Sequence, residues 1–175
     1  MTNKRNKLKK VERFEVSVHK TPLGSIFAVT AENNLCAVSF LQTWPVTLAK
    51  IQRRFRTENY VEAALYRDEF EAYFEKDFDA FNKVRMSTAG TEFQEKVWRQ
   101  LLEIPAGKTK TYGDISEALG IRGGARAVGQ AANKNPIGLV IPCHRCVGQS
   151  GLLTGFAAGV DRKRWLLEHE GALLL

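Results

Sequence analysis

The feature that most constrains the fold is a pair of short helical segments separated by a glycine-containing turn, between residues 115 and 135. The segment ISEALG is followed by the turn IRGG and by a second helical segment that begins at Ala125. Two short helices joined in this way form a helix-turn-helix. The second helix carries mostly tiny side chains, and its long polar residues are Arg126, Gln130 and Lys134.

This small-residue helix has two interpretations. Its flat surface can approach DNA closely in the narrow minor groove, where an arginine can enter the base stack. Alternatively, its tiny side chains allow tight packing inside a core. The net charge of +7 accompanies a cluster of seven acidic residues between positions 61 and 80, so the remainder of the chain is more basic than the total indicates. That asymmetry is expected of a chain that meets a polyanion on one face, but it leaves both interpretations open.

A second feature is the segment IPCHRCVG, residues 141–148, which holds two of the three cysteines and one of the three histidines. It suggests a redox pair, a metal site, or a cysteine nucleophile with its base. A thioredoxin-type pair opens a helix, whereas we expect Cys143 to end a buried strand. A zinc site needs further ligands at a metal-like spacing, and Cys36, His19 and His169 do not supply it. The pattern therefore favours Cys143 as a nucleophile.

Only the thiolate of a cysteine is a useful nucleophile, so Cys143 needs a base. Neighbouring side chains of an extended segment point to opposite sides, so we expect His144 to act on Cys143 through a water molecule. The late helical segment offers Glu168 and Glu170 as an acid that orients the histidine.

The rest of the chain predicts an α/β protein of the α+β type. Alternating and helical apolar periods predict three strands and then helices, at residues 14–20, 25–31, 35–40, 46–55, 64–74, 91–103 and 161–170. We expect a basic N-terminal arm at 1–12, an α+β domain at 13–88 and a second domain at 89–175. No signal peptide or apolar run of about eighteen residues is visible, and three cysteines suit a reducing compartment, so we expect a cytoplasmic protein without a membrane partner.

Several segments together resemble one known family. They are PCHR at 142–145, Asn135-Pro136 before it, ARAVG at 125–129, and RKRWLLEHEG at 162–171. The chain resembles the O6-alkylguanine-DNA alkyltransferases, also called methylated-DNA–protein-cysteine methyltransferases, in order from about Gly90 to Gly171 and more loosely in the first half. The resemblance implies a small ribonuclease H-like N-terminal sheet with helices. It also implies a mainly helical C-terminal domain with a helix-turn-helix and an active-site strand.

The resemblance implies a role for each motif residue. Cys143 would accept the alkyl group, His144 would be its base through water, and Glu170 would orient His144. Asn135 would brace the turn before the active-site strand. Tyr112 would help to rotate the nucleotide and protonate the leaving guanine.

On the DNA side, Arg126 would fill the gap left by a flipped base, with the small-residue helix against the minor groove. The other contact residues of that helix would be Ala125, Ala127, Gly129 and Gln130. The substrate pocket would be lined by Tyr112, Phe156 and Ala157.

The implied activity is transfer of a methyl or other alkyl group from O6-alkylguanine in double-stranded DNA to Cys143, with O4-alkylthymine as a second candidate substrate. The thioether product has no good leaving group, so we expect one turnover per molecule. We expect a monomer with no cofactor and no metal. Two alternatives are a thiol redox protein and a non-catalytic lesion binder, and the binder is disfavoured because such relatives replace the cysteine.

Three positions depart from the family pattern. Cys146 stands where an apolar residue such as valine is usual, either as a small buried hydrophobe or as a partner that oxidation links to Cys143. Phe156 and Ala158 stand where the family commonly has tyrosine and glycine. Loss of a tyrosine hydroxyl and gain of a methyl group would change the alkyl-group preference but not the reaction.

Overall fold

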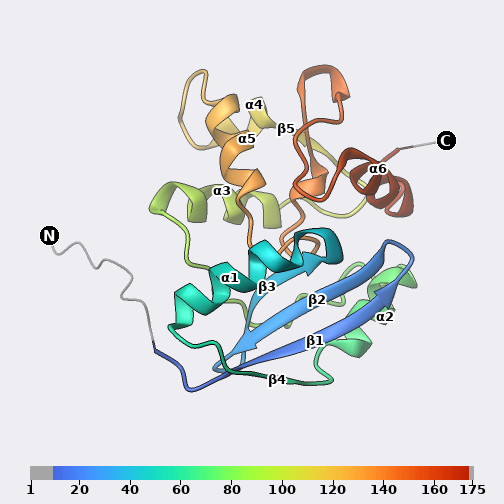
Figure 1. Ribbon diagram of the computed structural model, residues 1–175. Coiled ribbons are helices and arrows are strands. Elements are labelled where there is room, and N and C mark those ends of the chain that lie inside the picture. Colours follow the sequence, from blue (N-terminus) through green and yellow to red (C-terminus); the bar gives the residue numbers. More distant parts are fainter. Residues whose placement is uncertain (1–9, 174–175) are drawn as a thin grey trace, which may run out of the picture.

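A four-stranded sheet forms the base of the molecule in the computed structural model, which describes residues 10–173 (Figure 1). β1 (Phe14–Thr21), β2 (Gly24–Ala31) and β3 (Asn34–Phe40) form the antiparallel meander that the alternating pattern predicts. β4 (Tyr60–Glu62) adds in parallel to β1, giving the order β3-β2-β1-β4. The sequence did not predict β4 because three exposed residues carry no usable period.

The sheet is covered by a helix on each face because its strands are apolar on both sides. Val29 of β2 belongs to the apolar cluster with Ile51 and Phe55 of α1 (Trp44–Phe55), which follows a 3-10 turn at Leu41–Thr43. Ala28, the next residue along the strand, belongs to the larger cluster. That cluster includes α2 (Arg67–Phe74) and continues into the C-terminal half.

Four helices dominate the C-terminal half, above the sheet in Figure 1. They are α3 (Glu92–Leu102), α4 (Tyr112–Ala118), α5 (Ala125–Asn133) and α6 (Val160–His169). Two short strands, β5 (Lys110–Thr111) and β6 (Cys146–Val147), pair in parallel between them. Capping boxes begin α3 at Thr91 and α4 at Thr111, each satisfying helix N–H groups that would otherwise lack acceptors. The mixed α/β class is therefore confirmed.

The predicted helix-turn-helix is α4 followed by α5. An added Cβ at Gly124 would lie 2.6 Å from the Ile121 side chain and 2.7 Å from Ser116 Oγ, so the turn packs too closely for any larger residue. One face of α5 is buried through Val128, Ala131 and Ala132. Its other face is exposed, so both interpretations of the small-residue helix describe part of it.

The predicted strand that ends at Cys143 is wrong in its local structure. Residues 137–141 are mostly buried, but they make only isolated bridges, with Val38 and between Gly138 and Ile141. The Ile141 N–H donates to the Ile137 carbonyl at 2.9 Å, which closes a tight turn, and Leu139 adopts a left-handed φ of 74°. Cys143–Arg145 then form a 3-10 turn. A short apolar run indicates burial but does not distinguish a strand from a buried turn.

The predicted N-terminal arm lies mostly outside the described residues, which begin at Lys10. Its last part packs on the sheet half: Val11 is buried, and its N–H donates to the Phe55 carbonyl at 3.2 Å. The division at residue 88 stays a prediction. Between residues 10 and 173, no helix is both long enough and apolar enough to cross a membrane.

Candidate active site

Cys143 is placed by an irregular segment that Asn135 holds in shape. The Asn135 Nδ2 donates to the Ile141 carbonyl at 2.8 Å and to Cys143 Sγ at 3.2 Å. Its Oδ1 accepts from the Ile137 N–H at 3.0 Å. One amide side chain therefore fixes both ends of the turn and contacts the sulfur.

Cys143 is half-buried, and its thiol is not activated at rest. Burial raises the pKa of Cys143, and the hydrogen bond from Asn135 and the charge of Lys163 oppose that shift only in part. The thiol therefore keeps its proton at neutral pH until a base removes it.

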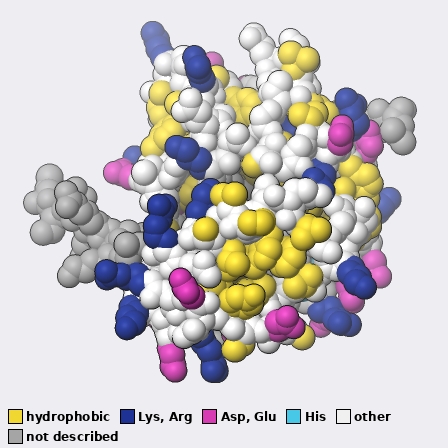
Figure 2. Space-filling model, in the orientation of Figure 1, with side chains coloured by type: hydrophobic (Ala, Val, Ile, Leu, Met, Phe, Trp, Pro, Cys, Tyr) yellow, Lys and Arg dark blue, Asp and Glu magenta, His cyan; other side chains and the backbone are white. Residues whose placement is uncertain are grey.

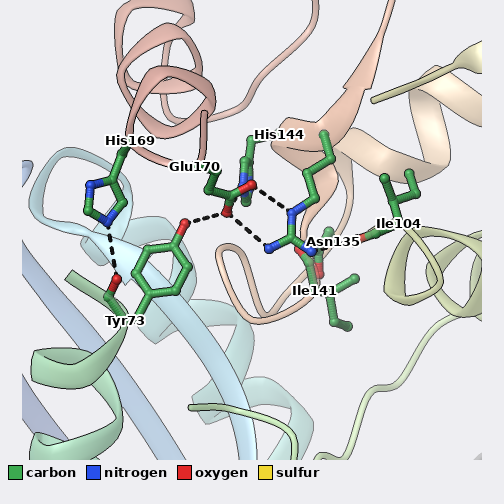
Figure 3. A network of polar contacts seen from close by, with 8 residues as sticks. Tyr73, Ile104, Asn135, Ile141, His144, His169 and Glu170 are labelled. Atoms are coloured by element: carbon green, nitrogen blue, oxygen red, sulfur yellow. Dashed lines mark hydrogen bonds and ion pairs between the residues drawn. The ribbon is translucent and has the colours of Figure 1, made fainter. Parts of the chain in front are cut away.

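His144, which follows Cys143 in the chain, forms a buried pair with Glu170 (Figure 3). His144 Nε2 lies 2.9 Å from Glu170 Oε1, while Nδ1 is buried and has no hydrogen-bond partner among the described residues. A carboxylate only accepts, so Nε2 carries the proton and Nδ1 presents a lone pair. Burial lowers the pKa of His144 despite the neighbouring carboxylate, so the ring is neutral. It can accept a proton at Nδ1.

Glu170 is held ionised by several donors. Arg145 donates from Nε to Oε2 at 2.8 Å and from its second terminal nitrogen to Oε1 at 3.0 Å. Burial alone would raise the pKa of Glu170, but the hydrogen bonds from His144 and Arg145 and the charge of Arg145 outweigh it and hold the pKa at about 2. The carboxylate is thus a fixed charge that orients His144.

Tyr73 of α2 also belongs to this network, although no sequence pattern indicated a functional role for it. Its hydroxyl donates to Glu170 Oε1 at 2.6 Å, although the two residues come from opposite halves of the chain (Figure 3). Burial, and then the charge of Glu170, raise the pKa of Tyr73, so it remains a donor. In the sequence it belongs to an aromatic stripe that predicts only core packing.

Lys163 is a second residue that sequence reasoning missed. Its side chain is fully buried, and Nζ donates to the carbonyls of Cys146 and Thr154 and lies 3.4 Å from the Tyr112 hydroxyl. Burial raises the pKa of Tyr112 to about 12, with further contributions from Cys146 and Cys143. The signal was available, because position 163 shares a helix face with the apolar Leu166 and Leu167.

Most of the predicted site residues line one of two cavities, but the buried His144 and Glu170 line neither. A cavity of about 300 Å³ is lined by Cys143, Asn135, Phe156, Ala157 and Ala158, together with residues of β3 and α1. A larger cavity of about 790 Å³ lies along α5 and is lined by Tyr112, Ala125, Arg126, Gly129 and Gln130, among others. Ala127 is exposed and lines neither cavity, and Tyr112 lies at the larger cavity rather than with Phe156.

Cys146 lies at the start of β6 and is completely buried. Burial raises the pKa of its thiol to about 12, and all three cysteines are free. These surroundings are those of a small buried hydrophobe, and an oxidative link to Cys143 stays a hypothesis. Within residues 10–173, no group of three or more His, Cys, Asp or Glu side chains is arranged to hold a metal ion.

Comparison with known proteins gives a consistent result. A family model described as "6-O-methylguanine DNA methyltransferase, DNA binding domain" matches residues 92–172. The methylated-DNA–protein-cysteine methyltransferase of Shigella flexneri is 39% identical over 161 residues, which cover 89% of this chain and 94% of that protein. The protein of the same name from Methanosarcina acetivorans is 38% identical over 156 residues, covering 89% of this chain and 97% of the relative.

Solved structures agree over the whole fold. The crystal structure of Mycobacterium tuberculosis O6-methylguanine methyltransferase has a TM-score of 0.75 and 35% identity, covering 91% of this chain and 93% of that chain. A structure described as Mycobacterium tuberculosis OGT in complex with DNA has a TM-score of 0.73 and 34% identity, with 90% and 93% covered. Identity of this extent over nearly the full length of both chains shows that this chain belongs to the methylated-DNA–protein-cysteine methyltransferase family.

Proposed function

We propose that this chain repairs alkylated DNA by direct reversal, moving a methyl or other alkyl group from O6-alkylguanine to Cys143. The observation that carries the proposal is the buried His144–Glu170 pair, whose unpartnered Nδ1 can take up the thiol proton. Family membership supports the same reaction, because the relatives are named methylated-DNA–protein-cysteine methyltransferases.

Proton movement follows from the geometry of the pair. A water molecule carries the proton of Cys143 to His144 Nδ1, and Glu170 stabilises the imidazolium that forms. The thiolate attacks the alkyl carbon in line with the carbon–oxygen bond, and the electrons of that bond leave with the guanine oxygen. Tyr112, which keeps its proton to about pH 12, protonates the departing base. The thioether has no leaving group, so each molecule reacts once.

The base must leave the duplex to reach this sulfur. In this proposal α5 lies against the minor groove, and the flipped guanine or O4-alkylthymine enters the smaller cavity, which Cys143 lines. Arg126 fills the gap that the flipped base leaves in the duplex. Arg126 is exposed and lines the larger cavity. Figure 2 shows Lys and Arg side chains along the side of the upper half that carries α4 and α5. Such side chains can neutralise the phosphates of a DNA backbone.

The reaction as written needs no cofactor, and a single copy of the chain supplies every residue in it, so we propose that the protein acts as a monomer. Because its substrate is cellular DNA, we propose that it acts in the cytoplasm of a cell without a nucleus, or in the nucleus of a eukaryotic cell. The alternatives are less well supported. A lesion binder has no need of a buried His144–Glu170 pair, and a redox pair needs a reactive second thiol, whereas burial raises the pKa of Cys146 to about 12.

Intact-protein mass tests the proposal. After incubation with a duplex that contains O6-methylguanine, the protein should gain the mass of one methylene group and no more. Cys143→Ala should gain nothing, and the matched variant Cys146→Ala should still gain it. An unmodified wild-type protein, or a gain that survives in Cys143→Ala, would contradict the proposal.

A further inference from the structure

The wall of the smaller cavity is a loop that two neighbouring side chains of α6 hold in place. Lys163 donates to the Thr154 carbonyl at 2.8 Å, at the start of the loop. Arg162 donates to the Ala158 carbonyl at 2.9 Å, at its end. Next to Ala158, the Gly159 N–H donates to the Phe156 carbonyl at 3.0 Å and closes a turn. The position of the Ala158 carbonyl therefore influences where Phe156 lies.

Lys163 makes its other contacts within the C-terminal half, but Arg162 reaches the N-terminal half. Its Nε lies 3.3 Å from the Leu23 carbonyl in the β1–β2 turn, and its second terminal nitrogen donates to Gln42 Oε1 at 2.9 Å. The guanidinium also covers the Phe40 ring at 4.8 Å. One rigid, planar group thus joins the sheet half to the loop that lines the cavity.

The two walls of the cavity come from the two halves of the chain. Phe156 and Ala158 form one side with Cys143, and Gln42 and Val46 form part of the other. Apolar side chains gather near α1 on the face shown in Figure 2, and Val46 of α1 is an exposed apolar residue. The contacts of Arg162 tie these two walls together, and this tie controls the distance between them.

We infer that Arg162 is a positioning residue that fixes the width of the alkyl pocket and so sets which alkyl groups Cys143 accepts. The inference rests on the proposed function. With the tie intact, the cavity of about 300 Å³ favours small alkyl groups. Without it, the loop is free to move outward, so a methyl group is held less well in line with the sulfur and a bulky group gains room.

Rate constants on two lesions test this inference. Single-turnover transfer is measured from duplexes bearing O6-methylguanine or O6-benzylguanine to the wild type and Arg162→Ala. We expect Arg162→Ala to slow methyl transfer about fivefold, the equivalent of one hydrogen bond of about 1 kcal/mol, and benzyl transfer less, so the benzyl-to-methyl ratio rises. Arg162→Lys keeps the charge but not the planar fork and should be intermediate. Arg164→Ala, an exposed arginine on the same helix, should change nothing.

A second variant removes one of the three contacts that Arg162 makes with the N-terminal half, and leaves those with Leu23 and Phe40. Gln42 is exposed, and Gln42→Ala leaves Arg162 and the loop sequence intact. It should raise the benzyl-to-methyl ratio in the same direction, and it should add nothing further in the Arg162→Ala background. Additive effects of the two substitutions would overturn the inference.

Hydrogen exchange separates this inference from the proposed function. In the free protein, amides of residues 154–159 should exchange faster in Arg162→Ala than in the wild type, and Arg164→Ala should match the wild type. If the wild type transfers no alkyl group, the proposed function fails, and the exchange rates still test the tie. Unchanged exchange, or an unchanged ratio in a protein that does react, overturns the inference.

Discussion

Glu170 is the residue on which the largest number of functional contacts converge. Its two oxygens accept from Tyr73, His144 and twice from Arg145. Tyr73 and His144 share one oxygen, Oε1, so the tyrosine hydroxyl withdraws charge from the atom that holds the imidazole. We therefore expect Tyr73 to lower the basicity of His144, although it lies on a helix of the other half.

Tyr73→Phe removes that hydroxyl and little else. A carboxylate with one donor fewer holds an imidazolium more strongly, so the pKa of His144 should rise towards its ordinary value and acid should inactivate the protein at a higher pH. Loss of a buried hydrogen bond to a charged group should cost about 2 kcal/mol of stability. Single-turnover rates measured against pH, together with urea unfolding, check both effects.

The control is Tyr66→Phe. Its hydroxyl accepts a hydrogen bond from Thr30 at 3.3 Å in the N-terminal half and does not contact Glu170. This variant should leave the pH profile unchanged. A Tyr73→Phe profile that coincides with that of the wild type would show that Tyr73 only packs.

Among the elements, α5 has one face that packs in the core and one face that is exposed. Its buried face is fixed from α3 by Trp98, whose Nε1 donates to the Ala131 carbonyl at 2.9 Å. An added Cβ at Gly129 would lie 3.7 Å from the Tyr112 ring, so the helix also contacts the tyrosine proposed to protonate the base. The exposed side is flat apart from Arg126 and Gln130. This arrangement suits a helix that must approach DNA closely.

Arg126→Ala tests the proposed place of α5 in the minor groove. If Arg126 fills the gap left by the flipped base, its loss should slow repair of a duplex substrate by about tenfold or more, because flipping costs a few kcal/mol that Arg126 no longer helps to offset. Transfer from free O6-benzylguanine should barely change, because no duplex is opened. Arg13→Ala removes an exposed charge from the sheet half and serves as the control. Equal losses on both substrates would exclude the assigned role.

Elements with local signals could be predicted from the sequence, and the segment before Cys143 could not. The capping residues Thr91 and Thr111 and the apolar periods of the later helices depend only on near neighbours in the chain. Even so, α4 begins at Tyr112, earlier than the apolar pattern predicted. The turn at residues 137–141 depends on contacts with Asn135 and Val38, which no periodicity records.

In the candidate site, too, some residues could be predicted from the sequence and others could not. The residues themselves predicted Cys143 as the nucleophile and His144 as its base, the resemblance selected Glu170 over Glu168, and the structure brings His144 and Glu170 into contact. Tyr73 looked like any core aromatic, since its partner lies 97 positions further along the chain. Arg162 belongs to a motif of the family, but its partners in the sheet half follow from tertiary packing, which the sequence does not record.

For the whole molecule, the N-terminal half is part of the site rather than a separate support. The hydroxyl of Tyr73 contacts Glu170, the Val38 N–H donates to the Pro136 carbonyl at 2.9 Å, and Arg162 holds Gln42. These contacts converge on the segment before Cys143, on its carboxylate and on the cavity wall. Loss of the buried charge network should therefore loosen both halves together.

The stability of the whole fold should depend on pH through this network. The pKa of Glu170 is about 2 in the folded protein against an ordinary value of 4.5, so the unfolded chain binds the proton first. The resulting stabilisation is present above pH 4.5 and is lost as the pH falls towards 2, with a size on the order of 3 kcal/mol. The lowered pKa of His144 acts in the same direction below its ordinary value of 6.5. Stability should therefore fall steadily with acid.

Urea unfolding between pH 7 and pH 3 measures this dependence, and Glu170→Gln isolates its source. The variant is less stable at neutral pH because Arg145 and His144 lose their buried partner, but its stability should fall less between pH 4.5 and 3 than that of the wild type. The slope of the free energy of unfolding against pH is the deciding quantity, because a loss of stability that is the same at every pH does not change this slope. Glu168→Gln, two residues earlier on α6, should keep the wild-type slope. If Glu170→Gln kept it as well, the acid sensitivity would belong to other carboxylates, and Glu170 could not be the fixed charge that holds His144 ready for the thiol proton.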